Sequence, residues 1–509
     1  MCPSPRPEII GTKQPQAAAI GANKKLTLSP TPPVECLSIT GPPSPALDQS
    51  KTFPECAIAF VREPVSSEVI DCSKIAIAKA GLVATPMNVM MAPDIITDGL
   101  QRMDASCAIV DADLWKRMGH AFEAAGVTPV MSIGAGPEES YPSFDDFIAD
   151  QSIEDPDVTI HSDDIWEVLF TSGTTGSPKA TMHFHRDVLM IADGYAKEVL
   201  GVTPDDVFVG SPPLAFTFGL GGLAVFPLRF GAAATLLEQA TPPNMIEIIE
   251  TYRATVCFTA PTAYRAMLAA MEDGADLSSL RAAVSAGETL PAPVYDDWIA
   301  RTGKPMLDGI GATEMLHIFI SNRFDDHRPA CTGRPVTGYE ARVVDDRMVE
   351  VPRGTPGRLA VRGPTGCRYL ADDRQKAYVQ DGWNITGDTF WQDEDGRFHF
   401  AARNDDMIIS AGYNIAGPEV EAALLSHPMV AECAVVGAPD PDRGEIVSAH
   451  VVLKPGIEAG EATARLLQDH VKAAIAPYKY PRKVVFREAL PKTETGKIQR
   501  FRLKGDGNA

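Results

Sequence analysis

A run of hydroxyl-bearing residues and glycines lies between two apolar segments in "LFTSGTTGSPKATMHF", residues 169–184. The glycines let backbone N–H groups approach a ligand, and the hydroxyls together with Lys179 supply hydrogen-bond donors and a positive charge. This combination suits a phosphate chain. Gly173, Gly176 and Lys179 do not have the G-x-x-x-x-G-K-[ST] spacing, and Ala180 follows the lysine. We predict a phosphate-binding loop of another kind, with a flexible linker as the alternative.

A second stretch, "LDGIGATEMLHIF" at 307–319, places a hydroxyl and a carboxylate after a glycine turn. Mg²⁺ prefers one or two carboxylates together with phosphate oxygens. Thr313 and Glu314 could therefore meet a phosphate group and its Mg²⁺. The alternative is a solvated loop carboxylate, because charged side chains usually lie at the surface.

Two further stretches carry polar groups on glycine-containing turns. In "DGWNITGDTFWQDEDGRFHF", residues 381–400, Asp388 follows a glycine and could accept hydrogen bonds from two neighbouring ribose hydroxyls. In "LPKTETGKIQR", residues 490–500, Lys497 follows a Thr/Gly turn near the C-terminus. Taken singly, each could be an ordinary surface residue.

The elements that position these residues are of two kinds. Between about 160 and 320, short apolar runs alternate with helical patterns, which predicts a largely parallel α/β sheet with ligands at the loops after the strands. From about 340, period-two alternation predicts antiparallel strands, followed by a compact α+β unit. We predict an irregular Pro-rich segment at 1–55, a large α/β domain at 56–402 and a small α+β domain at 403–509.

Composition restricts the partners. A formal net charge of −21 with no basic patch argues against nucleic acid and anionic membranes. The nine cysteines show no C-x-x-C spacing, which indicates reduced thiols in a cytoplasmic protein. No signal-peptide pattern is seen, and the uncharged stretch 211–228 contains prolines and glycines that suit a buried segment better than a membrane span.

Taken together and in this order, the four stretches resemble the acyl-adenylate-forming superfamily, which includes acyl-CoA synthetases, peptide-synthetase adenylation domains and luciferases. The resemblance covers roughly residues 56–503. It implies a large N-terminal domain with mostly parallel sheets, a small mobile C-terminal domain, and the use of ATP and Mg²⁺. It also implies that a carboxylic acid is converted to an acyl-AMP and then passed to a thiol.

The resemblance implies roles for individual residues. Those that would contact ATP are Thr171, Ser172, Gly173, Thr174, Thr175, Gly176, Lys179, Gly287, Glu288, Gly309, Ile310, Gly311, Asp388 and Arg403. Thr313 would touch the α-phosphate, Glu314 would bind Mg²⁺, and Lys497 would be the catalytic lysine. Asp405 would lie at the hinge and Gly412 would face CoA.

The stretch "MLHIF" after the TE pair resembles the benzoate and 2-aminobenzoate CoA ligase branch. This likeness implies a pocket for a flat aromatic acid, lined by Phe216, Ala286, Gly311, Met315 and His317. Simple packing is the alternative for His317 and Phe216. CoA is favoured as the acceptor because no carrier-protein domain is fused to the chain.

Other readings remain open at this point. The segment ahead of "KAGLVATPMN" at 79–88 is shorter and more Pro-rich than in the resembling family, so we expect a shortened first subdomain. A medium-chain fatty-acid CoA ligase and a poorly active nucleotide-binding scaffold are the alternative functions. The identity of the acid and the oligomeric state, including a homodimer, are left open.

Overall fold

The structure is a computed structural model of the chain. The residues it describes are 9–10, 57–62, 67–88, 92–133, 146, 149, 151, 154, 156–171, 178–237, 239–271, 274–403, 406–410, 413–440, 443–492 and 498–504. Ile9 and Ile10 form a short strand, and the rest of the predicted irregular segment 1–55 lies outside the described residues.

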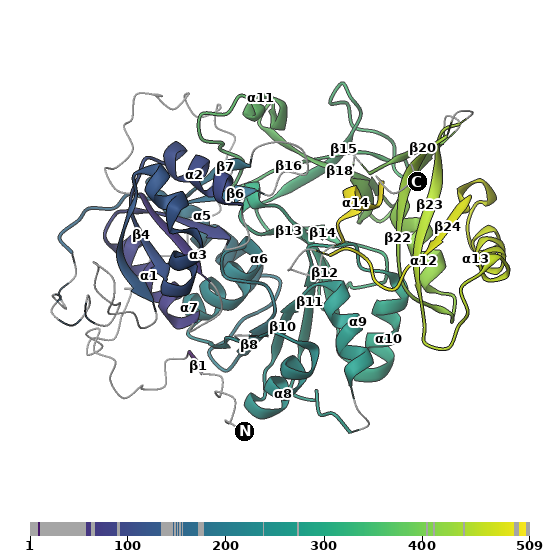
Figure 1. The fold of residues 1–509 in the computed structure, drawn as a ribbon, viewed down its shortest axis with the longest axis horizontal. Coiled ribbons are helices and arrows are strands. Elements are labelled where there is room, and N and C mark those ends of the chain that lie inside the picture. Colours follow the sequence, from purple (N-terminus) through teal and green to yellow (C-terminus); the bar gives the residue numbers. More distant parts are fainter. Residues whose placement is uncertain are drawn as a thin grey trace. The chain divides into compact units, whose positions relative to one another are not determined.

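The chain divides into two compact units (Figure 1). One consists of Met1–Ile10, Asp187–Cys367 and Asp373–Ala509, and the other of Gly11–Arg186 and Arg368–Asp372. The domain limits predicted from the sequence, 1–55, 56–402 and 403–509, stay predictions.

The unit that contains Gly11–Arg186 is built on a six-stranded sheet. Its strands, in spatial order, are β5 (Thr128–Ile133), β4 (Ala105–Asp111), β2 (Ala57–Arg62), β3 (Val83–Asn88), β6 (Ile165–Thr171) and β7 (Lys179–Phe184). All neighbours are parallel except β6 and β7, which form an antiparallel pair. Among the described residues, this unit includes the helices α1 (Ser67–Lys79), α2 (Pro93–Arg102) and α3 (Ala112–Ala125).

Helix α3 shows how local sequence sets these boundaries. The Asp111 carboxylate accepts hydrogen bonds from the N–H groups of Asp113 and Leu114, which satisfies the start of the helix. Gly126 ends it in the left-handed conformation. The apolar side of α3, including Leu114 and Phe122, is completely buried in the core of this unit.

The other unit contains an eight-stranded sheet. Its strands, in order, are β1 (Ile9–Ile10), β9 (Ala233–Thr235), β8 (Val207–Gly210), β10 (Val256–Thr259), β11 (Ala282–Ala286), β12 (Met306–Gly311), β13 (Ile318–Ser321) and β14 (Arg334–Pro335). The central strands β9, β8, β10, β11 and β12 are parallel, as the sequence predicts. Strands β10 and β11 are buried throughout, which explains their continuous apolar sequences.

Helices cover this sheet. Three of them, α8 (Pro242–Tyr252), α9 (Pro261–Ala270) and α10 (Ala292–Thr302), lie beside β10–β12 in Figure 1 and share one buried apolar cluster with those strands. Shorter helical segments lie between β7 and β9 in the chain: α5 (His185–Ile191), η1 (Ala192–Lys197), α6 (Thr217–Gly219), η2 (Leu220–Val225) and α7 (Phe226–Phe230). These segments supply the aromatic residues discussed below.

Two antiparallel sheets follow in the same unit. The first contains β15 (Glu340–Val344), β16 (Gly357–Arg362), β18 (Trp383–Gln392), β17 (Val379–Gln380) and β19 (Phe398–Arg403), with α11 (Arg374–Tyr378) before β17. The second contains β21 (Tyr413–Ile415), β20 (Ile408–Ser410), β23 (Gly444–Leu453), β22 (Val430–Asp440) and β24 (Lys483–Phe486). Strands β23 and β24 are the parallel pair in it.

Helices α12 (Gly417–Leu425) and α13 (Glu461–Ala474), the turn η4 (Pro477–Lys479) and helix α14 (Arg500–Lys504) accompany the second sheet. Pro418 stands in the first turn of α12, where its missing N–H costs nothing. Val420, Ala423 and Leu424 are buried and form the apolar face of this helix.

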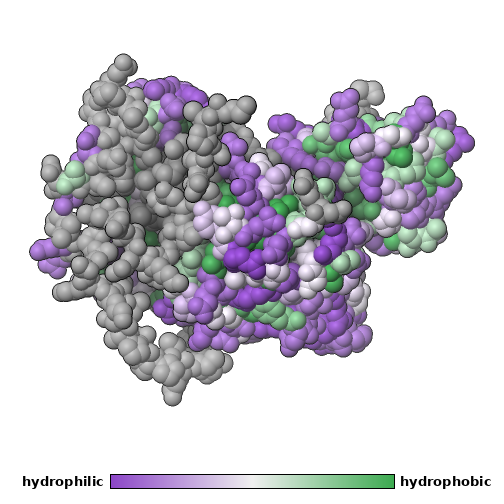
Figure 2. Space-filling view, turned by 90° about the horizontal axis from the view of Figure 1, so that it is seen from below, coloured by the Kyte–Doolittle hydropathy of each residue, from purple (hydrophilic) through white to green (hydrophobic). Residues whose placement is uncertain are grey.

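Hydrophilic residues cover most of the described surface in Figure 2, and apolar residues appear there in separate patches. Exposed large apolar side chains, such as Leu228, Leu466 and Phe501, come from different elements. Among the described residues, none of the helices has the length and apolar character needed to cross a bilayer.

Candidate active site

The predicted Thr313–Glu314 pair lies on a tight turn at the carboxyl end of β12. Residues Thr313–Met315 form one turn of 3-10 helix, and the Glu314 side chain is buried. Leu316 then adopts the left-handed conformation, with φ +68°, and turns the chain back into β13. A buried residue with a side chain rarely holds this conformation unless its surroundings impose it, so the turn is strongly constrained.

Glycine is needed at two positions of β12 because β13 approaches closely. A Cβ atom on Gly309 would lie 2.9 Å from the Ile318 side chain, and one on Gly311 would lie 2.8 Å from the His317 carbonyl oxygen. Ile310 between them is only partly buried, and Gly311 is exposed. The backbone predicted to contact ATP therefore carries no side chain at Gly309 and Gly311 and is exposed at the end of the strand.

Two residues that sequence reasoning missed hold this turn in place. The Thr365 hydroxyl donates to the Met315 carbonyl oxygen at 2.8 Å, and its oxygen lies 2.6 Å from the hydroxyl of buried Tyr339. Thr365 is 50 residues from Met315 along the chain, and nothing in its local sequence indicates this contact.

His317 follows the turn and is surrounded by aromatic rings. It is 2% exposed. Ring centroids lie 4.7 Å away for Phe226, 5.4 Å for Tyr195, 6.0 Å for Phe218 and 6.4 Å for Phe258. These rings come from α7, η1, α6 and β10, so four separate segments build an aromatic cluster around one imidazole.

The imidazole of His317 is neutral. Burial lowers its pKa to about 3, and the Phe218 backbone offsets this only in part. Neither ring nitrogen makes a hydrogen bond of normal geometry. A Cβ atom on Gly221 would lie 2.6 Å from Nε2, so the missing side chain at Gly221 makes room for the ring. A buried imidazole without partners can still donate and accept hydrogen bonds.

The other predicted pocket residues lie at the ends of neighbouring elements. Ala286 ends β11 and Met315 is in the 3-10 turn, and both are buried. Phe216 precedes α6 and is half-buried. Because β11 and β12 are adjacent and parallel, Ala286 pairs with Gly309 in register.

Asp308 is a buried acid that sequence reasoning missed, although a carboxylate inside an apolar parallel strand is a readable signal. Burial raises its pKa to about 8, with Ser285 and the Gly309 N–H lowering it in part. Ser285 on β11 pairs in register with Asp308. The Oδ1 atom of Asp308 makes no hydrogen bond. The group is therefore largely protonated at neutral pH.

Gly287 and Glu288 lie directly after β11. Gly287 has φ +88°, which suits glycine. The Glu288 carboxylate accepts a hydrogen bond from the Thr262 hydroxyl at 2.6 Å and one from the Thr262 N–H at 3.3 Å. Its side chain thus serves the first turn of α9, and any contact with ATP would come from the backbone of this loop.

The predicted ribose-binding pair is brought together by strand register. Asp388 in β18 pairs with Arg403 in β19 across the antiparallel ladder, and Arg403 Nε lies 3.8 Å from Asp388 Oδ1. Asp388 is buried and Arg403 exposed. Gly387, with φ +80°, precedes the acid.

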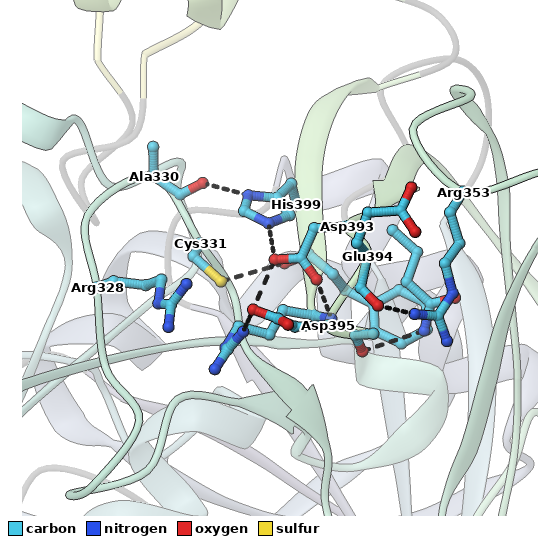
Figure 3. A network of polar contacts seen from close by, with 12 residues as sticks. Arg328, Ala330, Cys331, Arg353, Asp393, Glu394, Asp395 and His399 are labelled. Atoms are coloured by element: carbon cyan, nitrogen blue, oxygen red, sulfur yellow. Dashed lines mark hydrogen bonds and ion pairs between the residues drawn. The ribbon is translucent and has the colours of Figure 1, made fainter.

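A polar network fixes the other end of this hairpin (Figure 3). The Ala330 carbonyl accepts from His399 Nδ1 at 3.0 Å, and the Asp393 carboxylate lies 3.1 Å from Nε2. Arg397 binds Asp326 and Asp395 at 2.8 and 2.6 Å. These contacts tie the start of β19 to the segment after β13, so the strand that ends at Arg403 is held along its length.

In the other unit, the predicted phosphate loop is the connection of an antiparallel hairpin. Thr171 ends β6, Lys179 begins β7, and the two are paired in register. Lys179 Nζ donates to the Tyr369 hydroxyl at 3.2 Å and lies 5.1 Å from the centre of that ring. Tyr369, 190 residues away in sequence, is a contact that sequence reasoning missed.

Several predicted site residues lie outside the described residues. They are Ser172, Gly173, Thr174, Thr175, Gly176, Asp405, Gly412 and Lys497. Their predicted roles stay predictions. Lys497 belongs to a stretch whose two ends are paired: Lys492 and Ile498 form an antiparallel bridge.

Comparison with known proteins identifies the family. The model of the AMP-binding enzyme family matches residues 72–369, and that of the AMP-binding enzyme C-terminal domain matches residues 419–497. The chain belongs to the AMP-binding enzyme family. The predicted family and fold class, a large domain with mostly parallel sheets and a small α+β C-terminal domain, are thereby confirmed.

Individual proteins similar to this chain are aromatic acid–CoA ligases. The chain is 42% identical to the benzoate–CoA ligase of Thauera aromatica over 341 residues, which is 66% of this chain and 65% of that enzyme. It is 34% identical to the 3-hydroxybenzoate–CoA ligase of Aromatoleum sp. (strain CIB), covering 84% and 82%. The structure of the anthranilate CoA ligase AuaEII in complex with anthranoyl-AMP matches with TM-score 0.82 and 36% identity, covering 89% and 87%.

The family and these relatives together place this chain in the class of AMP-forming carboxylate–CoA ligases. Enzymes of this class use ATP and CoA as substrates and generally require Mg²⁺. The share of the Thauera enzyme that the chain spans is just under two thirds.

Proposed function

We propose that the protein activates an aromatic carboxylic acid of the benzoate or 2-aminobenzoate type with ATP and transfers the acyl group to CoA. One observation carries the proposal: the turn with Thr313 and Glu314 leads, three residues after Glu314, into His317 and its aromatic cluster. A flat ring suits such an apolar, aromatic environment. The names of the benzoate, 3-hydroxybenzoate and anthranilate ligases support the same class.

The reaction has two balanced steps. A carboxylate oxygen of the acid attacks the α-phosphorus of ATP, a new P–O bond forms, and the bond to the β-phosphate oxygen breaks so that pyrophosphate leaves. The sulfur of CoA then attacks the acyl carbon of the acyl-AMP, the thiol loses its proton, and AMP leaves with the electrons of the C–O bond.

The residues fit these needs. The first step brings an anion towards a polyanion, so positive charge must gather where charge builds up. Lys497 would supply it at the acid and α-phosphate, and the loop from Thr171 to Lys179 would hold the outer phosphates. Asp388 would accept hydrogen bonds from ribose hydroxyls beside Arg403.

The donor set also fits Mg²⁺. Glu314 offers a carboxylate and Thr313 a hydroxyl on consecutive residues, and Mg²⁺ binds through one or two carboxylates with phosphate oxygens and water. Among the described residues, no group of three or more His, Cys, Asp or Glu side chains forms a metal cluster. The ion would neutralise phosphate charge there.

The pocket would select the acid by shape and by one polar group. A neutral His317, whose ring nitrogens make no hydrogen bond of normal geometry within the protein, can accept a hydrogen bond from an amino or hydroxyl substituent, or donate one to it. Benzoate would leave the imidazole unpaired, whereas a substituted ring would satisfy it.

Pyrophosphate release by the full chain tests the proposal. The reaction is run with ATP and Mg²⁺ against benzoate, 2-aminobenzoate, 3-hydroxybenzoate and octanoate, each with and without CoA. Release that depends on an aromatic acid and becomes sustained only with CoA is the expected result. Preference for octanoate would replace the proposal with a medium-chain ligase, and ATP binding without release for any acid would favour the nucleotide-binding scaffold.

A further inference from the structure

The segment predicted to carry the catalytic lysine is held at both of its ends. Lys492 and Ile498 pair in an antiparallel bridge, and the Gln499 N–H donates to the Pro491 carbonyl at 2.8 Å. These contacts form the base of a loop, residues 493–497, whose last residue is Lys497. Whatever fixes the base limits where that lysine can be.

The C-terminal side of the base is anchored inside the small sheet. Arg500 binds the Glu421 carboxylate at 2.8 and 2.9 Å, and Glu421 also accepts the Val435 N–H at 2.8 Å. The Glu421 charge, with Asp406 and Glu288, raises the pKa of Arg500 against the effect of burial. Ile498 packs on an apolar cluster that includes Leu490.

The N-terminal side is anchored by a carboxylate with two cations. Lys492 Nζ lies 2.8 Å from Glu432 Oε2, and Arg265 Nη2 lies 3.0 Å from Glu432 Oε1. The three side chains are each between 25% and 30% exposed, so water screens them only in part. Glu432 belongs to β22 and Arg265 to α9 of the large sheet, so this carboxylate joins the loop base to α9.

Helix α9 is itself fixed to the candidate ATP site. Its first turn is held by the Glu288 carboxylate through Thr262. A continuous series of contacts therefore runs from the Gly287–Glu288 loop through α9 and Arg265 to Glu432 and Lys492. A conformational change at the Gly287–Glu288 loop or at Lys492 must therefore either break these contacts or move the contacting residues together.

We propose that Arg265, Glu432 and Lys492 form a positioning bridge that holds the base of the 493–497 loop against α9 and so places Lys497 for adenylation. These are positioning residues, because they act through Lys497. The inference rests on the proposed function. It predicts selectivity: only the first half-reaction uses Lys497, so loss of the bridge slows acyl-AMP formation and spares thioester formation.

The test compares the two half-reactions in Arg265→Gln, Glu432→Gln and the double variant. We expect adenylation kcat, measured by ATP–pyrophosphate exchange, to fall about fivefold in each single variant, with KM for the acid nearly unchanged. Thioester formation from supplied acyl-AMP should stay near the parent rate. The double variant should be no slower than Glu432→Gln, because both changes remove the same contact.

Two further variants serve as controls. Arg265→Lys keeps the positive charge and should restore most of the adenylation rate. Arg465→Gln removes an exposed ion pair with Glu461 on α13 and should leave both half-reactions unchanged. Equal losses in the two half-reactions, or additive losses in the double variant, would overturn the proposal.

Hydrogen exchange gives a readout that does not depend on activity. The amide of Gln499 is bonded in the loop base, so its exchange should speed up severalfold in Glu432→Gln and Lys492→Gln but not in Arg465→Gln. Unchanged exchange would contradict the bridge even if the parent turned over no acid. A parent inactive with every acid, together with faster exchange in these variants, would instead count against the proposed function alone.

Discussion

The candidate pocket and the base of the 493–497 loop differ in the surroundings of their ionisable groups. Asp308 and His317 are buried in the large sheet and its helices, and burial is the main cause that shifts the pKa of each group so that its neutral form is favoured. Glu421 and Glu432, in contrast, lie within ion-pair distance of cationic side chains: Arg500 for Glu421, and Arg265 and Lys492 for Glu432.

The two regions therefore fix the positions of their groups by different physical means. A neutral aromatic pocket gains specificity from shape and from hydrogen bonds that only the right ligand completes. An ion-paired segment is positioned by charge and can be released when the pairs separate, which suits a loop that we propose acts only in the first half-reaction.

Among the substitutions, we expect the greatest loss of activity from replacing Lys497 in the ion-paired region. Lys497→Ala should lower adenylation by about 10³-fold, because positive charge is lost where charge builds up on the α-phosphate. Thioester formation from supplied acyl-AMP should change little. ATP–pyrophosphate exchange and a thioester assay measure the two steps, with the exposed Lys454→Ala as control. Comparable losses in both steps would remove the special role of this lysine.

Asp308 tests the neutral side through stability. Its pKa is raised from 3.8 to about 8 in the folded protein, so its contribution to stability is fully present below pH 3.8 and is lost as pH rises through 8. Asp308→Asn should remove this dependence, a difference on the order of 4 kcal/mol between pH 5 and pH 8.5. Urea unfolding of both proteins at the two pH values measures it. Parallel pH profiles would show that the buried carboxyl is not neutral.

Gly221→Ala fills the space that His317 occupies. The added methyl would collide with the imidazole, displace it and close the pocket, so kcat/KM for benzoate should fall about 100-fold. Circular dichroism checks the fold. Gly460→Ala is the matched control, since a Cβ there meets no atom within 4 Å. Full activity in Gly221→Ala would move the acid-binding pocket elsewhere.

Replacing the imidazole of His317 tests whether its nitrogens contribute to the choice of acid. His317→Phe keeps an aromatic ring but removes both nitrogens, so benzoate should lose about threefold or less, and 2-aminobenzoate and 3-hydroxybenzoate about tenfold. Steady-state kinetics with the three acids measures the ratio. A uniform loss for all of them would mean that His317 acts by packing alone.

Much of the site could be predicted because its information is local. The turn with Thr313 and Glu314, the glycines of β12 and the strand-and-glycine sequence before Asp388 are readable over a few residues, and strand pairing then brings Asp388 to Arg403. The parallel order of the large sheet follows from alternating strands and helices, and the observed strand pairing confirms it.

What could not be predicted depends on contacts between distant residues. Thr365 reaches Met315 over 50 positions, and Tyr369 reaches Lys179 over 190. A lone Thr or Tyr carries no sign of its partner in one sequence. The pairing of Ile9 and Ile10 with β9 was missed for the same reason, since a two-residue strand has no periodicity. The cytoplasmic location, the oligomeric state and the predicted hinge at Asp405 stay predictions.

The left-handed turn at Leu316 has a consequence for how this protein can acquire new substrates. Glu314, Met315 and His317 fall within four consecutive residues whose path is fixed by one strained backbone conformation and by the Thr365 hydrogen bond. A change of acid preference made at Met315 or His317 should therefore also disturb the Glu314 carboxylate, the residue proposed to hold Mg²⁺. Divergence, natural or directed, has an easier route through Tyr195, Phe218 and Phe258, which surround the same imidazole but belong to segments other than this turn.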